Sequence, residues 1–107
     1  MNKIAMLLAL QPVITSSEVE GFGAVQIRQI SVTESERIRV AGKDAPAADF
    51  GLRLVIASVV ESDGSSVFDE SDLPALQGSA DAKMSKLVER VLEVNGYKAP
   101  AFPNASR

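Results

Sequence analysis

Apolar and polar residues follow two different periods along this 107-residue chain. Val25-Gln26-Ile27-Arg28 alternates apolar and polar side chains, as half-buried strands do, and residues 13–19 are rich in β-branched and small polar types. Gly21-Phe22-Gly23 supplies turn glycines between the two segments. The pattern predicts a β-hairpin over residues 13–30, whose second strand ends or bulges where the alternation breaks at Gln29-Ile30.

The second period is helical and dominates the rest of the chain. Residues 47–60 place Leu52, Val55, Ile56 and Val59 on one helical stripe, although their β-branched content leaves a strand as the alternative. A last helix, capped by Ser79 and ended by Asn95-Gly96, has an apolar face formed by Met84, Leu87, Val88, Val91 and Leu92.

Two shorter helices are predicted from end signals. Thr33-Glu34-Ser35-Glu36 has capping-box spacing, so a helix is expected to start there, turn Ile38 and Ala41 inward, and end at Gly42. Another is expected around residues 69–76, with Ser71 as its N-cap because this places Pro74 in the first turn.

These elements predict an α+β fold in a single domain, with a small N-terminal β-hairpin followed by three to four amphipathic helices. Residues 12–97 are expected to form that domain, since 107 residues suit one hydrophobic core. Residues 1–11 form a separate apolar segment. Residues 98–107 contain two prolines and no periodicity, so we expect a flexible Pro-containing tail.

The apolar run at residues 4–10 needs a surface to cover it. A secretory signal is disfavoured because the run is short, follows a single positive charge and lacks a small-x-small cleavage site before Gln11-Pro12. The run could pack on the domain's own core, or dock on a neighbouring subunit or client protein. The residues we expect to contact a partner are Ile4, Met6, Leu7, Leu8 and Leu10, followed by Met84, Leu87 and Val91, which are better suited to the core.

Composition narrows the function. The net charge of −3 argues against nucleic acid and anionic membrane surfaces as partners. The chain has no cysteine and no histidine, so it lacks thiolate chemistry and the commonest general base and metal ligand. We therefore expect that the chain is not an enzyme and that it binds no cofactor and no metal.

Four patterns with possible chemistry have simpler explanations. The pair Gly21 and Gly23 lacks the third glycine of a dinucleotide-binding loop, since position 26 is Gln26. Ser85 lies between two lysines but has no histidine to activate it. Two acidic groups are more typical of a solvated turn and of a helix N-terminus than of a calcium site or an acid–base pair: Glu61, Asp63, Gly64 and Glu70, and Asp69, Glu70 and Asp72.

The order of features resembles the tail assembly chaperones of long-tailed bacteriophages (siphophages). The resemblance covers residues 12–96, and its second half consists of residues 52–60, the Asp63-Gly64 turn, Val67-Phe68, Ser71-Asp72-Leu73 and the final helix ending at Asn95-Gly96. The first half is the hairpin with its Gly-Phe-Gly turn, continued through residues 25–36. Pro74 and the apolar N-terminal run stand outside it.

The resemblance implies a non-catalytic protein in the host cell cytoplasm that binds the helix-rich tape-measure protein before the tail tube polymerises. It also implies self-association, and often a longer form made by translational frameshifting. The alternative is a structural virion subunit, such as a head-tail connector or tail component, which would remain in the finished particle.

Overall fold

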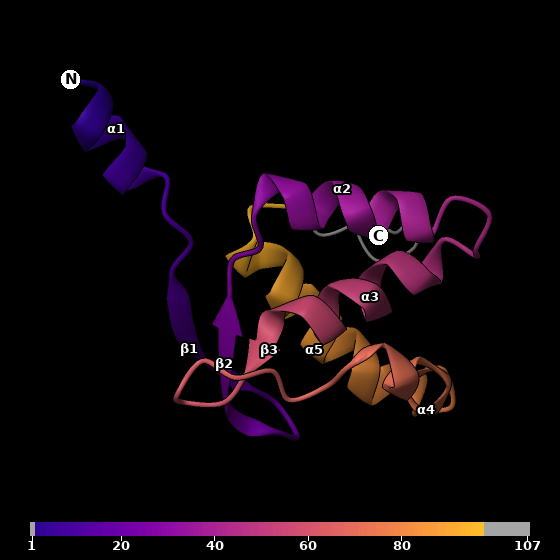
Figure 1. The fold of residues 1–107 in the computed structure, drawn as a ribbon. Helices are drawn as coiled ribbons and strands as arrows, with labels where there is room; N and C mark the ends of the chain where they lie inside the picture. Colours follow the sequence, from indigo (N-terminus) through magenta and orange to yellow (C-terminus); the bar gives the residue numbers. More distant parts are fainter. Residues whose placement is uncertain (1, 98–107) are drawn as a thin grey trace, which may run out of the picture.

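The structure is a computed structural model that describes residues 2–97, and it has the predicted α+β architecture in one domain (Figure 1). The elements in chain order are α1 (Lys3–Ala9), β1 (Ile14–Val19), β2 (Gly23–Arg28), α2 (Val32–Ala41), α3 (Ala48–Ser58), β3 (Val59–Val60), the 3-10 turn η1 (Glu70–Asp72), α4 (Leu73–Gln77) and α5 (Asp81–Val94). The tail predicted at 98–107 lies outside the described residues.

The predicted β-hairpin is confirmed and forms most of a three-stranded antiparallel sheet in the order β1-β2-β3. Its register runs from Ile14 opposite Arg28 to Val19 opposite Gly23. Gly21 and Gly23 both have positive φ, 89° and 78°, which is the backbone conformation that a tight turn demands and a side chain disfavours. The second strand ends at Arg28, where the alternation in the sequence breaks.

The hydrophobic core lies between the sheet and helices α3 and α5, which pack against each other. Ile27 in the central strand and Leu54 and Val55 in α3 are completely buried, as is Val91 in α5. α3 can approach α5 closely at Gly51, since a Cβ at that position would lie 2.9 Å from Val88 Cγ1. The helical stripes predicted for residues 47–60 and for the last helix both face this core.

The helix predicted over residues 47–60 extends two residues too far at its C-terminal end. α3 ends at Ser58, and Val59 and Val60 form β3, which pairs with Ile27 and Gln26 of β2. Val59 has an extended backbone, with φ −77° and ψ 123°. Pairing with the central strand therefore overrides the helical period at a pair of β-branched residues, which favour extended backbone.

Three predicted helix starts are wrong by one to two residues. The capping box of α2 is Ser31 with Glu34, not Thr33 with Glu36. Asp69 caps η1 in place of Ser71, and its Oδ1 accepts a hydrogen bond from the Ser71 N–H at 2.8 Å. α5 follows Ala80 without a side-chain cap, because the Ser79 hydroxyl donates to the Ala75 carbonyl instead. For α2 and η1, the predicted capping residue had a nearby competitor of similar capping ability, Ser31 and Asp69 respectively.

Asn95, the residue after α5, joins three segments that are distant in sequence. Its Oδ1 accepts a hydrogen bond from the Ile30 N–H at 2.8 Å, and its Nδ2 donates to the Ser58 Oγ and the Val91 carbonyl at 3.2 and 3.0 Å. Ser58 is completely buried. The end of α5 is therefore fixed to both the end of α3 and the connection from β2 to α2.

Arg28 and Glu34 form an ion pair that fixes the first turn of α2 to β2. The Arg28 Nη1 donates to Glu34 Oε1 at 3.0 Å, and a second bond joins Nη2 to Oε2. Glu34 Oε1 also accepts the Ser31 backbone N–H at 2.9 Å. The Arg28 hydrogen bonds lower the pKa of Glu34 to about 2, and the Ser31 N–H adds to this effect.

The first prediction concerns the core. Replacing Leu54, which is 0% exposed, by Ala is expected to lower the free energy of unfolding by about 2–5 kcal/mol through lost transfer energy and a residual cavity. Leu8→Ala, at a residue that is 69% exposed, is expected to change it by less than about 0.5 kcal/mol. Urea denaturation followed by circular dichroism measures both, and equal losses would contradict this core assignment.

The second prediction concerns pH. Folding lowers the pKa of Glu34. The ionised carboxylate therefore stabilises the folded chain above about pH 4.5, and this contribution to the free energy of unfolding is lost as the pH falls toward about 2. Glu34→Gln keeps the capping geometry but removes the charge, so it is expected to cost about 2 kcal/mol at pH 7. The difference from the unmodified chain is expected to shrink as the pH falls through this window.

Glu36→Gln is the matched control, because Glu36 pairs with Arg39 on the exposed surface, where such pairs contribute about 0.5 kcal/mol or less. Urea titrations at several pH values between 7 and 2 provide the comparison. A Glu34→Gln penalty that stayed constant down to pH 2 would contradict the assignment to this ion pair.

Candidate functional site

Within residues 2–97, the largest group of exposed apolar side chains belongs to helix α1 and the residue that follows it. Its large side chains and that of Leu10 are between 50% and 73% exposed, and α1 has no buried residue; these side chains are Ile4, Met6, Leu7, Leu8 and Leu10. Asn2 caps the helix by accepting the Ala5 N–H at 2.8 Å. The five N-terminal residues expected to contact a partner therefore lie together on an accessible helix, and they do not pack on the domain's own core.

The arrangement of α1 makes it a projecting arm. It extends from the start of β1, away from helices α2 to α5 (Figure 1). The sheet holds the chain from Val13 onward, because the Val13 carbonyl accepts the Gln29 N–H at 2.9 Å and the Val13 N–H donates to Gln29 Oε1 at 3.1 Å. Residues 10–12 connect this fixed point to the helix.

Without a partner, α1 would be unfavourable in water for two reasons, its exposed apolar side chains and its short length. Apolar side chains surround most of the helix, as in helices that are covered by other protein. It has only seven residues, far fewer than the roughly 12–15 that an isolated helix needs to be stable in water. Contact with a partner would bury the side chains and hold the helix, so α1 has the properties of a segment that folds firmly on binding.

The three α5 residues in the expected partner set lie elsewhere. Leu87 and Val91 are 3% and 0% exposed and belong to the hydrophobic core, and Met84 packs against that core from a half-buried position. Leu87 and Val91 therefore have no surface to offer in this conformation, because α3 and the sheet cover the face that carries them. We do not retain them in the candidate site.

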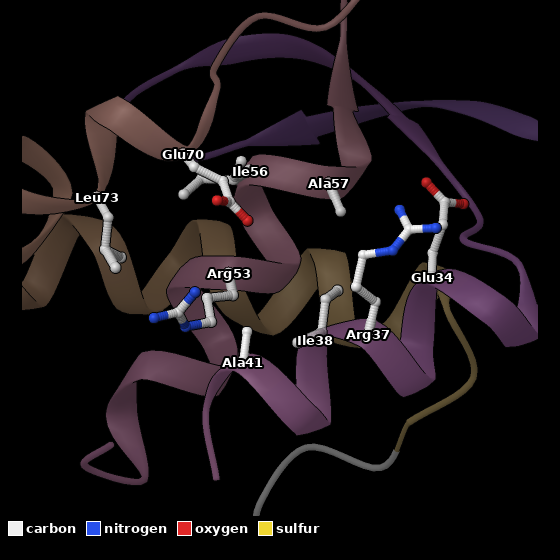
Figure 2. Close-up of a pocket in the computed structure, with 9 residues that line it drawn as sticks. All are labelled: Glu34, Arg37, Ile38, Ala41, Arg53, Ile56, Ala57, Glu70 and Leu73. Carbon is white, nitrogen blue, oxygen red and sulfur yellow. The ribbon is translucent and has the colours of Figure 1, made fainter. Parts of the chain in front are cut away.

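A groove between α2 and α3, hereafter the α2–α3 groove, is a second candidate surface and was not predicted from the sequence. It has a volume of about 110 Å³. Its floor is apolar and its edges are charged; the lining residues are Ile38, Ala41, Ile56, Ala57, Leu73, Glu34, Arg37, Arg53 and Glu70. Figure 2 shows Arg37 beside Glu34 at one end, and Arg53 near Ala41 and Leu73 at the other.

The α2–α3 groove can hold one apolar side chain rather than a drug-sized ligand, for which pockets usually measure about 300–1,000 Å³. Mixed charges at its edges could pair with polar groups that flank such a side chain. No local pattern of residues predicts the groove, because it exists only through the packing of two separate helices.

The three aspartates of the acidic groups, Asp63, Asp69 and Asp72, accept hydrogen bonds within turns. Asp69 caps η1, and Asp72 Oδ2 accepts the Asp69 N–H at 2.9 Å. Asp63 Oδ1 accepts both the N–H and the hydroxyl of Ser65, at 2.9 and 2.6 Å. These bonds lower the pKa values of Asp63 and Asp69, chiefly through the Ser65 and Ser71 hydroxyls, so both carboxylates are held in the charged form.

Lys86, one of the two lysines that flank Ser85, is paired with a carboxylate and is not set up as a base for that serine. Lys86 Nζ lies 2.9 Å from Glu20 Oε1 at the turn of the hairpin. Its hydrogen bond and charge interaction with Glu20 raise the pKa of Lys86, whereas a lysine that acts as a base needs a lowered one. Among residues 2–97, no group of three or more acidic side chains is placed to hold a metal ion.

No helix within residues 2–97 is long and apolar enough to cross a membrane. Comparisons of the chain with protein-family models, with curated proteins and with solved structures found no match. We therefore infer the function from the exposed arm, the charge of the domain and the resemblance in the sequence.

Proposed function

We propose that this chain is a non-catalytic tail assembly chaperone of a long-tailed bacteriophage. It binds the tape-measure protein in the host cell cytoplasm and keeps it soluble until the tail tube polymerises around it. The observation that carries the proposal is α1, an apolar helix held clear of the domain with none of its side chains buried. The resemblance over residues 12–96 supplies the identity of the client.

The chemistry of the arm suits such a client. A long helical protein waiting for its tube exposes apolar stripes that aggregate with one another. A short apolar helix can cover part of a stripe by helix-to-helix contact, and each fully buried Leu, Ile or Met contributes about 1.5–3 kcal/mol. Because α1 is small, the covering stays reversible, which a chaperone requires when the tube displaces it.

The charge of the domain supports solubilisation. The whole chain carries a net charge of −3, and α1 itself has no acidic residue and one lysine, Lys3. The acidic groups are therefore on the body of the protein, which remains in water while the arm contacts the client. Like-charged bodies along one client repel each other and oppose aggregation. The proposal requires no cofactor, metal, nucleic acid or membrane.

The third prediction tests the arm. In co-expression with the tape-measure protein of the same phage, replacing both Leu7 and Leu8 by Glu is expected to abolish soluble co-purification of the client. Losing two buried side chains costs at least about 3 kcal/mol, or about 100-fold in affinity. The measurement is the amount of tape-measure protein in the soluble fraction and in the affinity-purified complex.

The matched control replaces Val32 and Val40 of α2 by Glu, because these side chains are 88% and 67% exposed and the change in charge is the same. The control should retain the client. Equal client recovery with both double variants would contradict a role for α1. Failure of the unmodified chain to bind the client, together with its presence in purified virions, would instead identify a structural subunit of the particle.

A further inference from the structure

The outer edge of β1 is a six-residue strand edge with no strand beside it in the described part of the chain. The Gln29 N–H donates to the Val13 carbonyl, so odd-numbered residues of this strand direct their backbone groups toward β2. Ile14, Ser16 and Glu18 therefore direct theirs outward. β1 has no proline, lysine or bulge, three of the usual devices that protect a sheet edge from pairing, and Glu18 is its only charged residue.

Exposed apolar side chains are concentrated at the same edge. Of the large hydrophobic residues that are exposed within residues 2–97, all but Val32, Val40 and Val67 belong to α1, its connection to β1, β1 itself or the β1–β2 turn. Those nearest the strand are Val13 and Ile14 at one end and Phe22 at the other, which are 53%, 51% and 45% exposed. The unpaired edge of β1 therefore has exposed apolar side chains at both of its ends.

We propose that this edge joins two copies of the chain, with β1 of each copy antiparallel to β1 of the other about a two-fold axis at Ser16. This register places Ile14 opposite Glu18 of the second copy and Ser16 opposite its own equivalent. All the outward N–H and C=O groups of Ile14, Ser16 and Glu18 are then paired. The two sheets become one continuous sheet.

A second copy fits this edge because β1 is complementary to itself in that register. No like charges face each other directly: each Glu18 lies opposite an isoleucine, and the two Glu18 positions are four residues apart along the strands, or about 13 Å, beyond the ~10 Å Debye length at 0.1 M salt. A helical client cannot satisfy a row of backbone donors and acceptors, whereas an extended strand can. The contact is isologous and closes at two copies.

The pairing also brings the turn that carries the exposed Phe22 of each copy near the start of β1 of the other copy. Val13 lies opposite Val19 of the second copy, and the second copy's turn with Phe22 follows beside the base of α1. The two α1 arms then emerge at opposite ends of the paired β1 strands. A single dimer therefore presents two arms to a long partner. Two arms on one body raise the effective concentration for the second contact.

Disulfide trapping tests the proposed register. The chain has no cysteine, so Ser16→Cys creates one thiol for each copy. Opposed residues of a hydrogen-bonded antiparallel pair have Cα atoms about 5.5 Å apart, within the range that a disulfide spans. Under mild oxidation Ser16→Cys is expected to form a covalent dimer in high yield, whereas Ser85→Cys, at an exposed residue of α5, is expected to stay largely monomeric.

Light scattering during size-exclusion chromatography tests the contact without oxidation. The full chain is expected to elute with the mass of a dimer, Ser16→Lys as a monomer because two lysines would meet on the axis, and Ser85→Lys as a dimer. Circular dichroism checks that each variant is folded. A monomeric full chain, or a dimer that Ser16→Lys leaves intact, would overturn the proposal. Neither experiment contains a client, so its result is independent of the proposed chaperone function.

Discussion

The side chain of Asn95 is the constraint on which the arrangement of the domain depends. Its hydrogen bonds to the Ile30 N–H and to the Ser58 and Val91 oxygens bring the end of α5 to the ends of β2 and α3. Leaving the buried Ser58 hydroxyl without a partner would cost about 1–3 kcal/mol, so Asn95 stabilises these ends in contact with each other. With them fixed, Ile27 and Val91 meet in one core, and β3 is positioned to pair with β2.

α1 stands outside this cooperative unit. Its apolar side chains make no contribution to the core, although their burial there would have been favourable, and a four-residue connection ending at the fixed Val13 holds it beyond the sheet. Surface of this kind favours aggregation unless a partner covers it. The chaperone proposal gives these residues a client to cover. The proposed sheet contact uses the neighbouring edge of β1 and leaves the tip of α1 accessible.

Elements with a strong local period could be predicted from the sequence, whereas features set by distant contacts could not. The alternation at residues 25–28 predicted β2, and the apolar stripe that contains Leu87 and Val91 predicted α5. In both cases the spacing of apolar residues matches the face that is buried. β3 was missed because two residues carry no period, and only pairing with β2 makes them a strand. No local pattern predicts the α2–α3 groove. The sequence predicted that Asn95 ends the last helix, but not its hydrogen bonds to distant segments. The exposed apolar residues of the arm were identified, but not their helical conformation.

The most direct test of the central claim, that α1 is a binding arm and not part of the core, is hydrogen exchange measured by mass spectrometry with and without the tape-measure protein. In the free chain, amides of residues 5–10 are expected to exchange almost as fast as in an unfolded peptide, while those of β2 and α3 remain protected. In the complex, residues 5–10 are expected to become strongly protected with little change in β2. Fast exchange of α1 in the complex, with new protection only elsewhere, would contradict the account.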